Sequence, residues 1–249
     1  MNSARSEAAA SPAMIAPAVR APGQWQRLAF SEASLSAAKW LAVVLMVIDH
    51  WNHYLLGFSA HWMMCIGRVS MPLFAVVLGY NLSRPGQLAS GGYARTALRL
   101  AVFGAIATVP FIALNKLAGG WWPLNMMFTL LVATLVAWMW DDGRPWPVIL
   151  SFPLLLWSGC LSEYWWPGIG LVLAVWAYQR SPSAWRALSF MICMLLLYFI
   201  NHNMWALAAL PVLALVQWWK IPLPRAQWLF YAFYPVHLGL FWLYLHLVA

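Results

Sequence analysis

Residues 35–56 read LSAAKWLAVVLMVIDHWNHYLL, an apolar segment with Lys39 near its start and Asp49 and His50 near its end. A helix rises 1.5 Å per residue, so about 20 apolar residues cross the roughly 30 Å of hydrocarbon in a bilayer. The segment is long enough to do so. Its ionisable side chains then need an explanation, because each costs about 3 kcal/mol at the centre of a membrane helix.

The rest of the chain shares this apolar character. Of 249 residues, 64% are hydrophobic and only 8% are charged, whereas soluble domains contain about a quarter charged residues. A soluble enzyme is therefore excluded, and so is a disordered chain, which needs low hydrophobicity and high charge. The 19 tryptophans suit a membrane protein, because amphipathic rings favour its two interfaces with water.

We predict an all-α, polytopic membrane helical bundle with about nine transmembrane helices, eight or ten being the alternatives. Residues 1–30 are expected to form a flexible cytoplasmic tail and residues 31–249 a single transmembrane domain. The expected spans are residues 35–56, 61–82, 96–114, 122–140, 146–161, 163–179, 187–201, 203–219 and 227–248.

The basic residues predict the orientation of the chain in the membrane. If the N-terminus is cytoplasmic, eleven of the 14 Lys and Arg residues lie in inner segments, and only Lys116 lies in an outer one. This bias follows the positive-inside rule and favours an odd number of spans. The net charge of +8 then reflects topology, and we expect no direct binding of nucleic acid, whose binders cluster Lys and Arg on one face.

An acid and an arginine are expected at one depth on neighbouring helices. Asp49 lies about seven residues below the outer end of the first span, and Arg68 lies about seven residues into the second. We predict that the two form an ion pair. Pro72 cannot bond to the carbonyl of Arg68, which indicates a polar cavity rather than a dry helix seam.

Other polar residues are expected to gather in the outer half of the bundle. His50 is the candidate catalytic residue, beside Asp49 and Arg68, although a packing role stays open for each polar residue. No metal site is expected, because the three cysteines lack metal-ligand spacing. The candidates for substrate binding are His53, Asn125, Thr129, Glu163, Tyr234 and His237.

Five ordered motifs stand out between residues 35 and 245. They are Lys39…Met46-Val-Ile-Asp49-His50, Gly67-Arg68-Val-Ser-Met-Pro72-Leu-Phe74, Arg99 with Pro110-Phe111, Asn125-Met-Met-Phe-Thr129-Leu, and Tyr231-Ala-Phe-Tyr234-Pro235-Val-His237-Leu. Together they resemble the TraX/TrbP family of conjugation-associated inner-membrane proteins, which includes a pilin N-acetylase. The family's Asp-Tyr-Gly element is here Glu163-Tyr164-Trp165. More loosely, the pattern is similar to membrane acyltransferases that carry acetyl groups across the bilayer.

The resemblance implies an acetyltransferase that uses cytoplasmic acetyl-CoA and modifies the N-terminus of a pilin or another small membrane protein. By this resemblance, His50 matches the intramembrane histidine expected to act in transfer. Acyl transfer needs a base or nucleophile, for which His50 is suited, and positive charge or donors at the developing oxyanion, for which Arg68 or Asn125 is suited. The basic residues expected to meet the coenzyme phosphates are Lys39, Arg84, Arg95 and Arg99.

Three other functions stay open. A proton-coupled transporter also uses intramembrane Asp, His and Arg, but its polar path should connect both faces. A non-catalytic pilus or conjugation assembly factor would need the polar residues only for folding. A haem or quinone protein would need two facing histidines, and His50 with His237 is the pair that could supply them.

Overall fold

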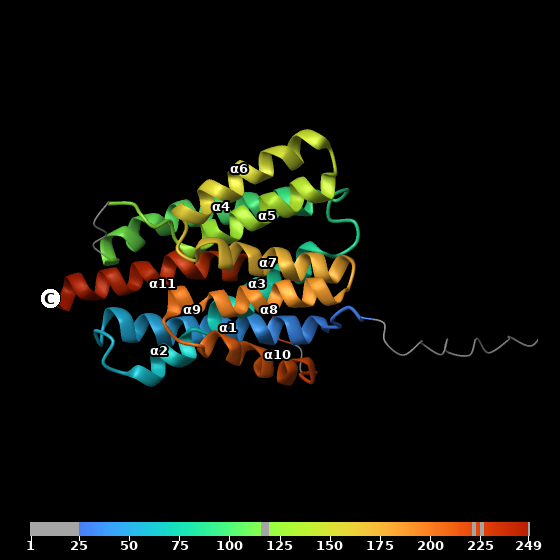
Figure 1. Ribbon diagram of the computed structural model, residues 1–249. Coiled ribbons are helices and arrows are strands. Elements are labelled where there is room, and N and C mark those ends of the chain that lie inside the picture. Colours follow the sequence, from blue (N-terminus) through green and yellow to red (C-terminus); the bar gives the residue numbers. More distant parts are fainter. Residues whose placement is uncertain (1–24, 116–119, 221–222, 225–226, 249) are drawn as a thin grey trace, which may run out of the picture.

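Apolar helices, joined by short connections, form an antiparallel bundle (Figure 1). The computed structural model describes residues 25–115, 120–220, 223–224 and 227–248. Each of the nine predicted segments contains helix within these ranges, although residues 122–125, 163–164 and 203–204 are not helical. In chain order the helices are α1 (Glu32–Tyr54), α2 (His61–Gly67), α3 (Ser70–Leu82), α4 (Gly92–Asn115), α5 (Met126–Asp142), α6 (Pro145–Leu161), α7 (Trp165–Arg180), α8 (Ala184–Leu196), α9 (Tyr198–Asn201), the 3-10 helix η1 (Trp205–Ala208), α10 (Ala209–Gln217) and α11 (Gln227–Val248).

Five helical segments of the described chain are long and apolar enough to cross a membrane. They are Glu32–Tyr54, His61–Leu82, Gly92–Leu114, Ala184–Asn201 and Trp228–Val248. The predicted all-α membrane architecture is thus confirmed in this coarser form. Helices α5, α6 and α7, with 17, 17 and 16 residues, are shorter, and nine crossings stay a prediction.

The two ends of the bundle differ in charge. We name them after the predicted orientation: the outer end holds residues 55–60 and the C-terminal end of α11, and the inner end holds residues 83–91 and the start of α1 (Figure 1). The described basic residues that lie at the inner end are Arg27, Arg84, Arg95, Arg144, Arg180, Arg186 and Lys220. The structure therefore groups the residues that the positive-inside rule places in the cytoplasm.

Exposed tryptophans mark both ends of the bundle, as expected where helices leave the hydrocarbon for water. At the outer end they are Trp51, Trp62, Trp121, Trp122, Trp165, Trp166 and Trp205. At the inner end they are Trp25, Trp146, Trp185, Trp218, Trp219 and Trp228. The apolar side chains exposed between these two groups suit contact with lipid.

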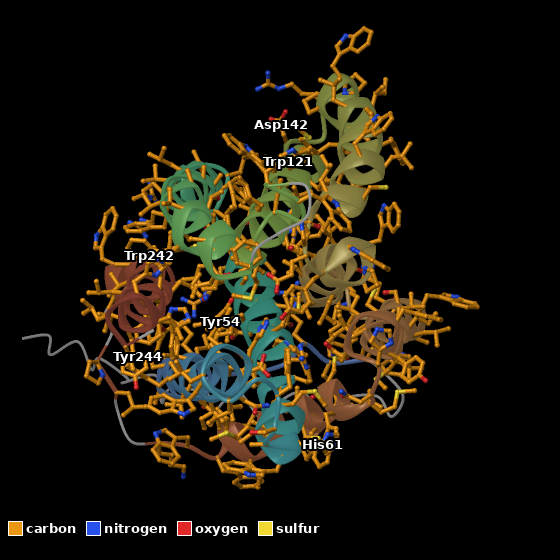
Figure 2. The ribbon with its side chains drawn as sticks, turned by 90° about the vertical axis from the view of Figure 1, so that its left-hand side faces the viewer. Tyr54, His61, Trp121, Asp142, Trp242 and Tyr244 are labelled. Carbon is orange, nitrogen blue, oxygen red and sulfur yellow. The ribbon has the colours of Figure 1, made fainter. Side chains whose placement is uncertain are left out.

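Helix α3 occupies the centre of the bundle, and the other helices surround it (Figure 2). Most of its residues are buried. The hydroxyl of Ser70 donates to the carbonyl of Ala42 over 2.7 Å and ties α3 to α1. At Gly79, α3 approaches α7 so closely that a Cβ would lie 2.6 Å from the carbonyl oxygen of Val172. Polar bonds and small residues thus fix α3, as is typical of helix contacts in membranes.

The predicted tail boundary at residue 30 differs from the structure. Leu28 pairs with the buried side chain of Gln179 in α7, which accepts from its N–H and donates to its carbonyl, both over 3.0 Å. The hydroxyl of Tyr178 donates to the carbonyl of Gln26 over 2.7 Å. Packed structure therefore begins before residue 31, because α7 satisfies the backbone of this segment. Residues 1–24 lie outside the described residues.

Candidate functional site

The predicted pairing of Asp49 with Arg68 is present in the structure. Helix α2 ends at Gly67, and α3 begins at Ser70, so the predicted span 61–82 is interrupted at Arg68, four residues before Pro72. Arg68 Nη1 lies 3.9 Å from Asp49 Oδ2, and both side chains are largely buried. Two further atoms of this pair, Asp49 Oδ1 and Arg68 Nε, are buried without a hydrogen-bond partner.

A glycine allows this approach. A Cβ built on Gly67 would lie 2.3 Å from Asp49 Cβ and 2.6 Å from Asp49 Cγ, well inside van der Waals contact. The backbone of α2 therefore rests directly against the Asp49 side chain. This contact sets how near Arg68, the next residue, comes to α1.

His50 points to another helix. Its Nδ1 lies 2.7 Å from Nε2 of His237 in α11, and His237 Nδ1 lies 2.8 Å from the carbonyl oxygen of Phe233. The two imidazole rings are parallel to within 2°, with centroids 5.0 Å apart. Their residues are 187 positions apart in the chain, and the contact of α1 with α11 brings them together.

A small cavity lies beside Asp49 and His50. We call it the histidine cavity; its lining is Met46, Asp49, His50, Gly67, Ser70, Met126, Glu163, Tyr164 and Tyr234. Its volume of about 20 Å³ suits one water-sized molecule. Glu163 Oε2, like Asp49 Oδ1, is buried there without a partner. Unsatisfied buried polar atoms are costly, so their presence around one cavity points to a bound polar group.

A backbone pairing positions Glu163 on the cavity wall. Leu124 N–H donates to the carbonyl of Leu161 over 2.8 Å, and Glu163 N–H donates to the carbonyl of Leu124 over 2.9 Å. These bonds join the start of α5 to the connection between α6 and α7. Tyr164 and Ser70 also line the cavity, and no sequence pattern assigned a role to either residue.

Four predicted substrate-binding residues, among them His237, do not line the histidine cavity. His53 is stacked against the rings of Tyr54 and Phe58 at the outer end of α1. Asn125 caps α5 by accepting from Met127 N–H over 3.1 Å, and its amide donates to the carbonyl of Gly104 over 3.0 Å. Thr129 is buried, and its hydroxyl has no partner. Asn125 therefore joins α5 to α4, which leaves Arg68 as the candidate group for an oxyanion.

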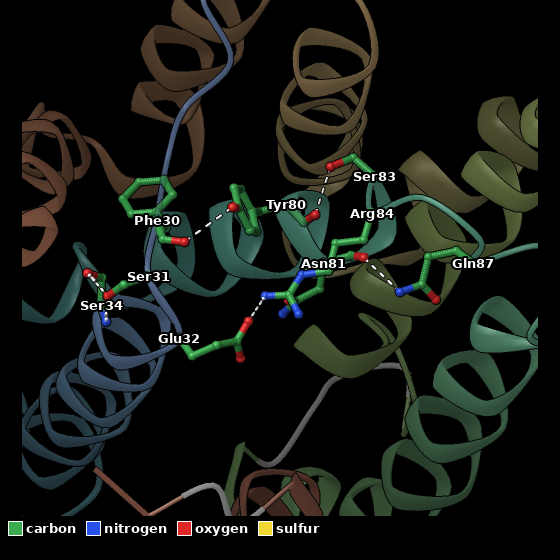
Figure 3. Close-up of polar contacts among 9 residues, drawn as sticks. All are labelled: Phe30, Ser31, Glu32, Ser34, Tyr80, Asn81, Ser83, Arg84 and Gln87. Carbon is green, nitrogen blue, oxygen red and sulfur yellow. Dashed lines mark hydrogen bonds and ion pairs between the residues drawn. The ribbon is translucent and has the colours of Figure 1, made fainter. Parts of the chain in front are cut away.

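A second, larger cavity lies toward the inner end. We call it the basic cavity; its volume is about 340 Å³, within the usual range of ligand sites of roughly 300–1,000 Å³. All four residues predicted to meet coenzyme phosphates line it: Lys39, Arg84, Arg95 and Arg99. Glu32, which also lines it, forms an ion pair with Arg84 over 2.5 Å (Figure 3). Four cations face one carboxylate, so the cavity suits an anion.

Aromatic rings hold two of these cations. The Arg99 guanidinium lies 4.6 Å from the ring centroid of Trp228 and 5.8 Å from that of Tyr231. The Lys39 ammonium lies 5.2 Å from the ring centroid of Phe230. Cation–π contacts of this kind keep a cation in place without neutralising its charge. The start of α11 thus forms one wall of the basic cavity.

The two cavities share a wall. Met46, Met126 and Tyr234 line both the histidine cavity and the basic cavity. Met side chains are flexible, so such a wall can adapt to a group that passes it. The arrangement places a cationic chamber at the inner end directly next to a buried acid and histidine.

A family model described as "TraX protein" matches residues 34–245. The chain belongs to the TraX family. The matched residues of this TraX-family chain include every lining residue of the histidine cavity.

Two TraX proteins of Escherichia coli are similar to the chain. A "Protein TraX" from this organism is 30% identical over 171 residues, which is 68% of this chain and 65% of that relative. The chain thus spans a little less than two thirds of that relative's length. A "Protein TraX" from strain K12 is 46% identical over 57 residues, or 23% of each chain. No solved structure matches the chain.

The distance between the ring nitrogens of His50 and His237 can be compared with the spacing that a shared metal ion requires. Metal–nitrogen bonds are about 2.0–2.1 Å long, so an ion held between two histidines separates their ring nitrogens by more than 2.7 Å. His50 and His237 hydrogen-bond directly to each other instead. Within the described ranges, no group of three or more His, Cys, Asp or Glu residues is placed to hold a metal ion.

We predict that Gly67→Ala destabilises the protein by about 1–3 kcal/mol, because its methyl group would overlap the Asp49 side chain. Thermal unfolding of the purified protein in detergent measures this change. The matched control is Gly239→Ala in α11, where a Cβ would meet nothing within 4 Å. Equal melting temperatures for Gly67→Ala and Gly239→Ala would contradict the close approach of α2 to Asp49.

Proposed function

We propose that this TraX-family chain is a membrane-embedded acetyltransferase of the bacterial inner membrane. It takes an acetyl group from cytoplasmic acetyl-CoA and transfers it to the N-terminal amine of a conjugative pilin or a similar small membrane protein. One observation carries the proposal: the basic cavity and the histidine cavity lie next to each other and share a wall. The family resemblance supplies the acetyl donor and the pilin acceptor.

The basic cavity suits the donor. Coenzyme A carries several phosphates, and the cavity offers the guanidinium groups of Arg95 and Arg99 on α4 and of Arg84 on the segment between α3 and α4. Arginine matches phosphate oxygens with paired N–H donors. A phosphate that binds here would compete with Glu32 for Arg84, because the two now form an ion pair (Figure 3).

The histidine cavity suits the reaction. The pantetheine thioester would reach His50 past Met46, Met126 and Tyr234. His50 can then act as a general base toward the amine, or carry the acetyl group itself. Arg68, paired with Asp49, brings positive charge to the oxyanion that forms on the thioester carbonyl. Low-dielectric surroundings strengthen that interaction.

The outer half suits an amine acceptor. Asp49 Oδ1 and Glu163 Oε2 are buried acceptors without partners. An incoming N-terminal ammonium would supply the missing donors and the compensating charge. It would reach the cavity from the outer end, where the connection 162–164 forms part of the wall.

A proton-coupled transporter is the second candidate, and the shared wall also favours it. A transport path must connect both faces, and the two cavities extend polar surface from the outer half toward the inner end. Acetyl transfer explains in addition why the inner chamber carries an excess of cations rather than alternating charges.

The intact mass of mature pilin co-expressed with the protein tests the proposal. Pilin should gain the mass of one acetyl group with the wild-type protein and none with His50→Ala at matched membrane levels. His246→Ala is the matched control, because His246 is exposed near the C-terminal end of α11 and should leave acetylation unchanged. Unmodified pilin with the wild-type protein would contradict pilin acetylation. Acetylation that survives His50→Ala would contradict the role of His50.

Removing a cation of the basic cavity should weaken donor binding and leave the chemical step intact. We expect Arg95→Gln to raise the KM for acetyl-CoA about tenfold, since a charge-assisted hydrogen bond contributes about 1.5–3 kcal/mol, and kcat should change little. Steady-state kinetics with the purified protein and a pilin peptide measure both constants. Arg144→Gln is the control, because Arg144 lies at the inner end but outside the cavity lining. Equal KM values for the two variants would contradict the proposal that the basic cavity binds acetyl-CoA.

A further inference from the structure

The hydrogen bond between His50 and His237 has a direction, and the backbone of α11 sets it. His237 Nδ1 lies 2.8 Å from the carbonyl oxygen of Phe233. A carbonyl oxygen only accepts, so this ring nitrogen must carry the proton. In a neutral imidazole the other nitrogen is then bare, and His237 Nε2 is an acceptor.

This acceptor determines the tautomer of His50. Because His237 Nε2 lies 2.7 Å from His50 Nδ1, the proton between them belongs to His50 Nδ1. Parallel rings whose centroids are 5.0 Å apart meet edge to edge, which aligns the N–H with the lone pair. His50 Nε2 then keeps its own lone pair. No group in the described part of the chain bonds to that nitrogen.

We propose that His237 is a positioning residue that holds His50 in the tautomer with a bare Nε2. His237 is buried and does not line the histidine cavity, so it acts through His50 rather than on a substrate. The Phe233 carbonyl, His237 and His50 form a relay in which each member fixes the proton of the next. The catalytic consequence rests on the proposed acetyl transfer; the tautomer itself does not.

The bare Nε2 is what either form of acetyl transfer requires. As a base, Nε2 takes a proton from the acceptor amine while the amine nitrogen bonds to the thioester carbon. The C–S bond then breaks, and the leaving thiolate takes that proton from Nε2. As an acyl carrier, Nε2 itself attacks the thioester carbon, the C–S bond breaks and the thiolate leaves. The amine then attacks the acetyl carbon, the bond to Nε2 breaks, and the proton of the amine passes through the freed Nε2 to the thiolate. A proton on Nε2 would block both routes.

Nitrogen NMR of the protein with 15N-labelled histidine reads the tautomer directly, without any reaction. The His50 signals are assigned as those that vanish in His50→Asn. We expect a protonated Nδ1 and a bare Nε2 for His50, and the same pattern for His237. A protonated Nε2 on His50 in the wild-type protein would overturn the proposal.

Two variants of His237 separate positioning from packing. His237→Gln keeps an acceptor oxygen within reach of His50 Nδ1, whereas His237→Met fills similar space without a strong acceptor. We expect the Gln variant to keep the His50 tautomer and the Met variant to lose it. In acetyl transfer, kcat should fall about 100-fold or more in His237→Met, while the KM for acetyl-CoA changes less than about twofold. In His237→Gln, kcat should fall less than about tenfold.

The outcomes distinguish this proposal from the proposed function. An unchanged His50 tautomer in His237→Met, or equal losses of kcat in the Gln and Met variants, would overturn the positioning role. The predicted tautomer in a wild-type protein that transfers no acetyl group would support the relay and contradict the acetyltransferase. Thermal unfolding of each variant confirms that the comparison is made between folded proteins.

Discussion

The contact between Gly67 and the Asp49 side chain is the constraint on which the rest of the site depends. An ionisable group in the membrane needs a partner, and Asp49 finds one only if the second helical segment approaches α1 at that depth. Gly67 permits the approach because it has no Cβ. The helix then breaks at Arg68, which turns a guanidinium toward the acid. Ser70, two residues further, bonds back to Ala42 of α1 and secures the arrangement.

Further polar bonds near this contact also join segments that are distant in the chain. His50, one residue after Asp49, bonds to His237 of α11. A backbone bond to Leu124 holds Glu163 on the wall of the histidine cavity. In a bundle whose helices offer mostly apolar surfaces, such bonds fix which faces meet. The site is therefore built from the groups that also specify the packing. Replacing one of these polar groups therefore affects both the site and the helix packing.

The sequence predicted what depends on local geometry. The depth of Asp49 and Arg68 follows from the rise of a helix, and the polar surroundings of Arg68 follow from the carbonyl that Pro72 cannot bond. The position of Arg84 and Arg95 at the inner end follows from the positive-inside rule, and Lys39 and Arg99 lie near the inner ends of the first and third predicted spans. These four residues line one cavity only because α1, α3, α4 and α11 pack together, and no local sequence pattern predicts that packing.

Other features depend on tertiary contacts and were not predictable. The sequence offered His50 and His237 only as a pair that could face each other, and their direct bond depends on the contact of α1 with α11, because the two residues are 187 positions apart. Asn125 looked like an oxyanion donor, but its amide is committed to Gly104 and to the cap of α5. The place of Tyr164 on the cavity wall depends on the pairing of Leu124 with the connection after α6. The role of a side-chain amide or hydroxyl can be assigned only when its hydrogen-bond partners are known.

We propose that the basic cavity and the histidine cavity form one path that joins a cytoplasmic donor to an acceptor on the other side of the membrane. Sealed inside-out membrane vesicles test it, with a pilin-derived peptide enclosed and labelled acetyl-CoA supplied only in the medium. We expect the enclosed peptide to become labelled with the wild-type protein and to stay unlabelled with His50→Ala. Labelling only when the peptide and acetyl-CoA share one compartment would contradict it.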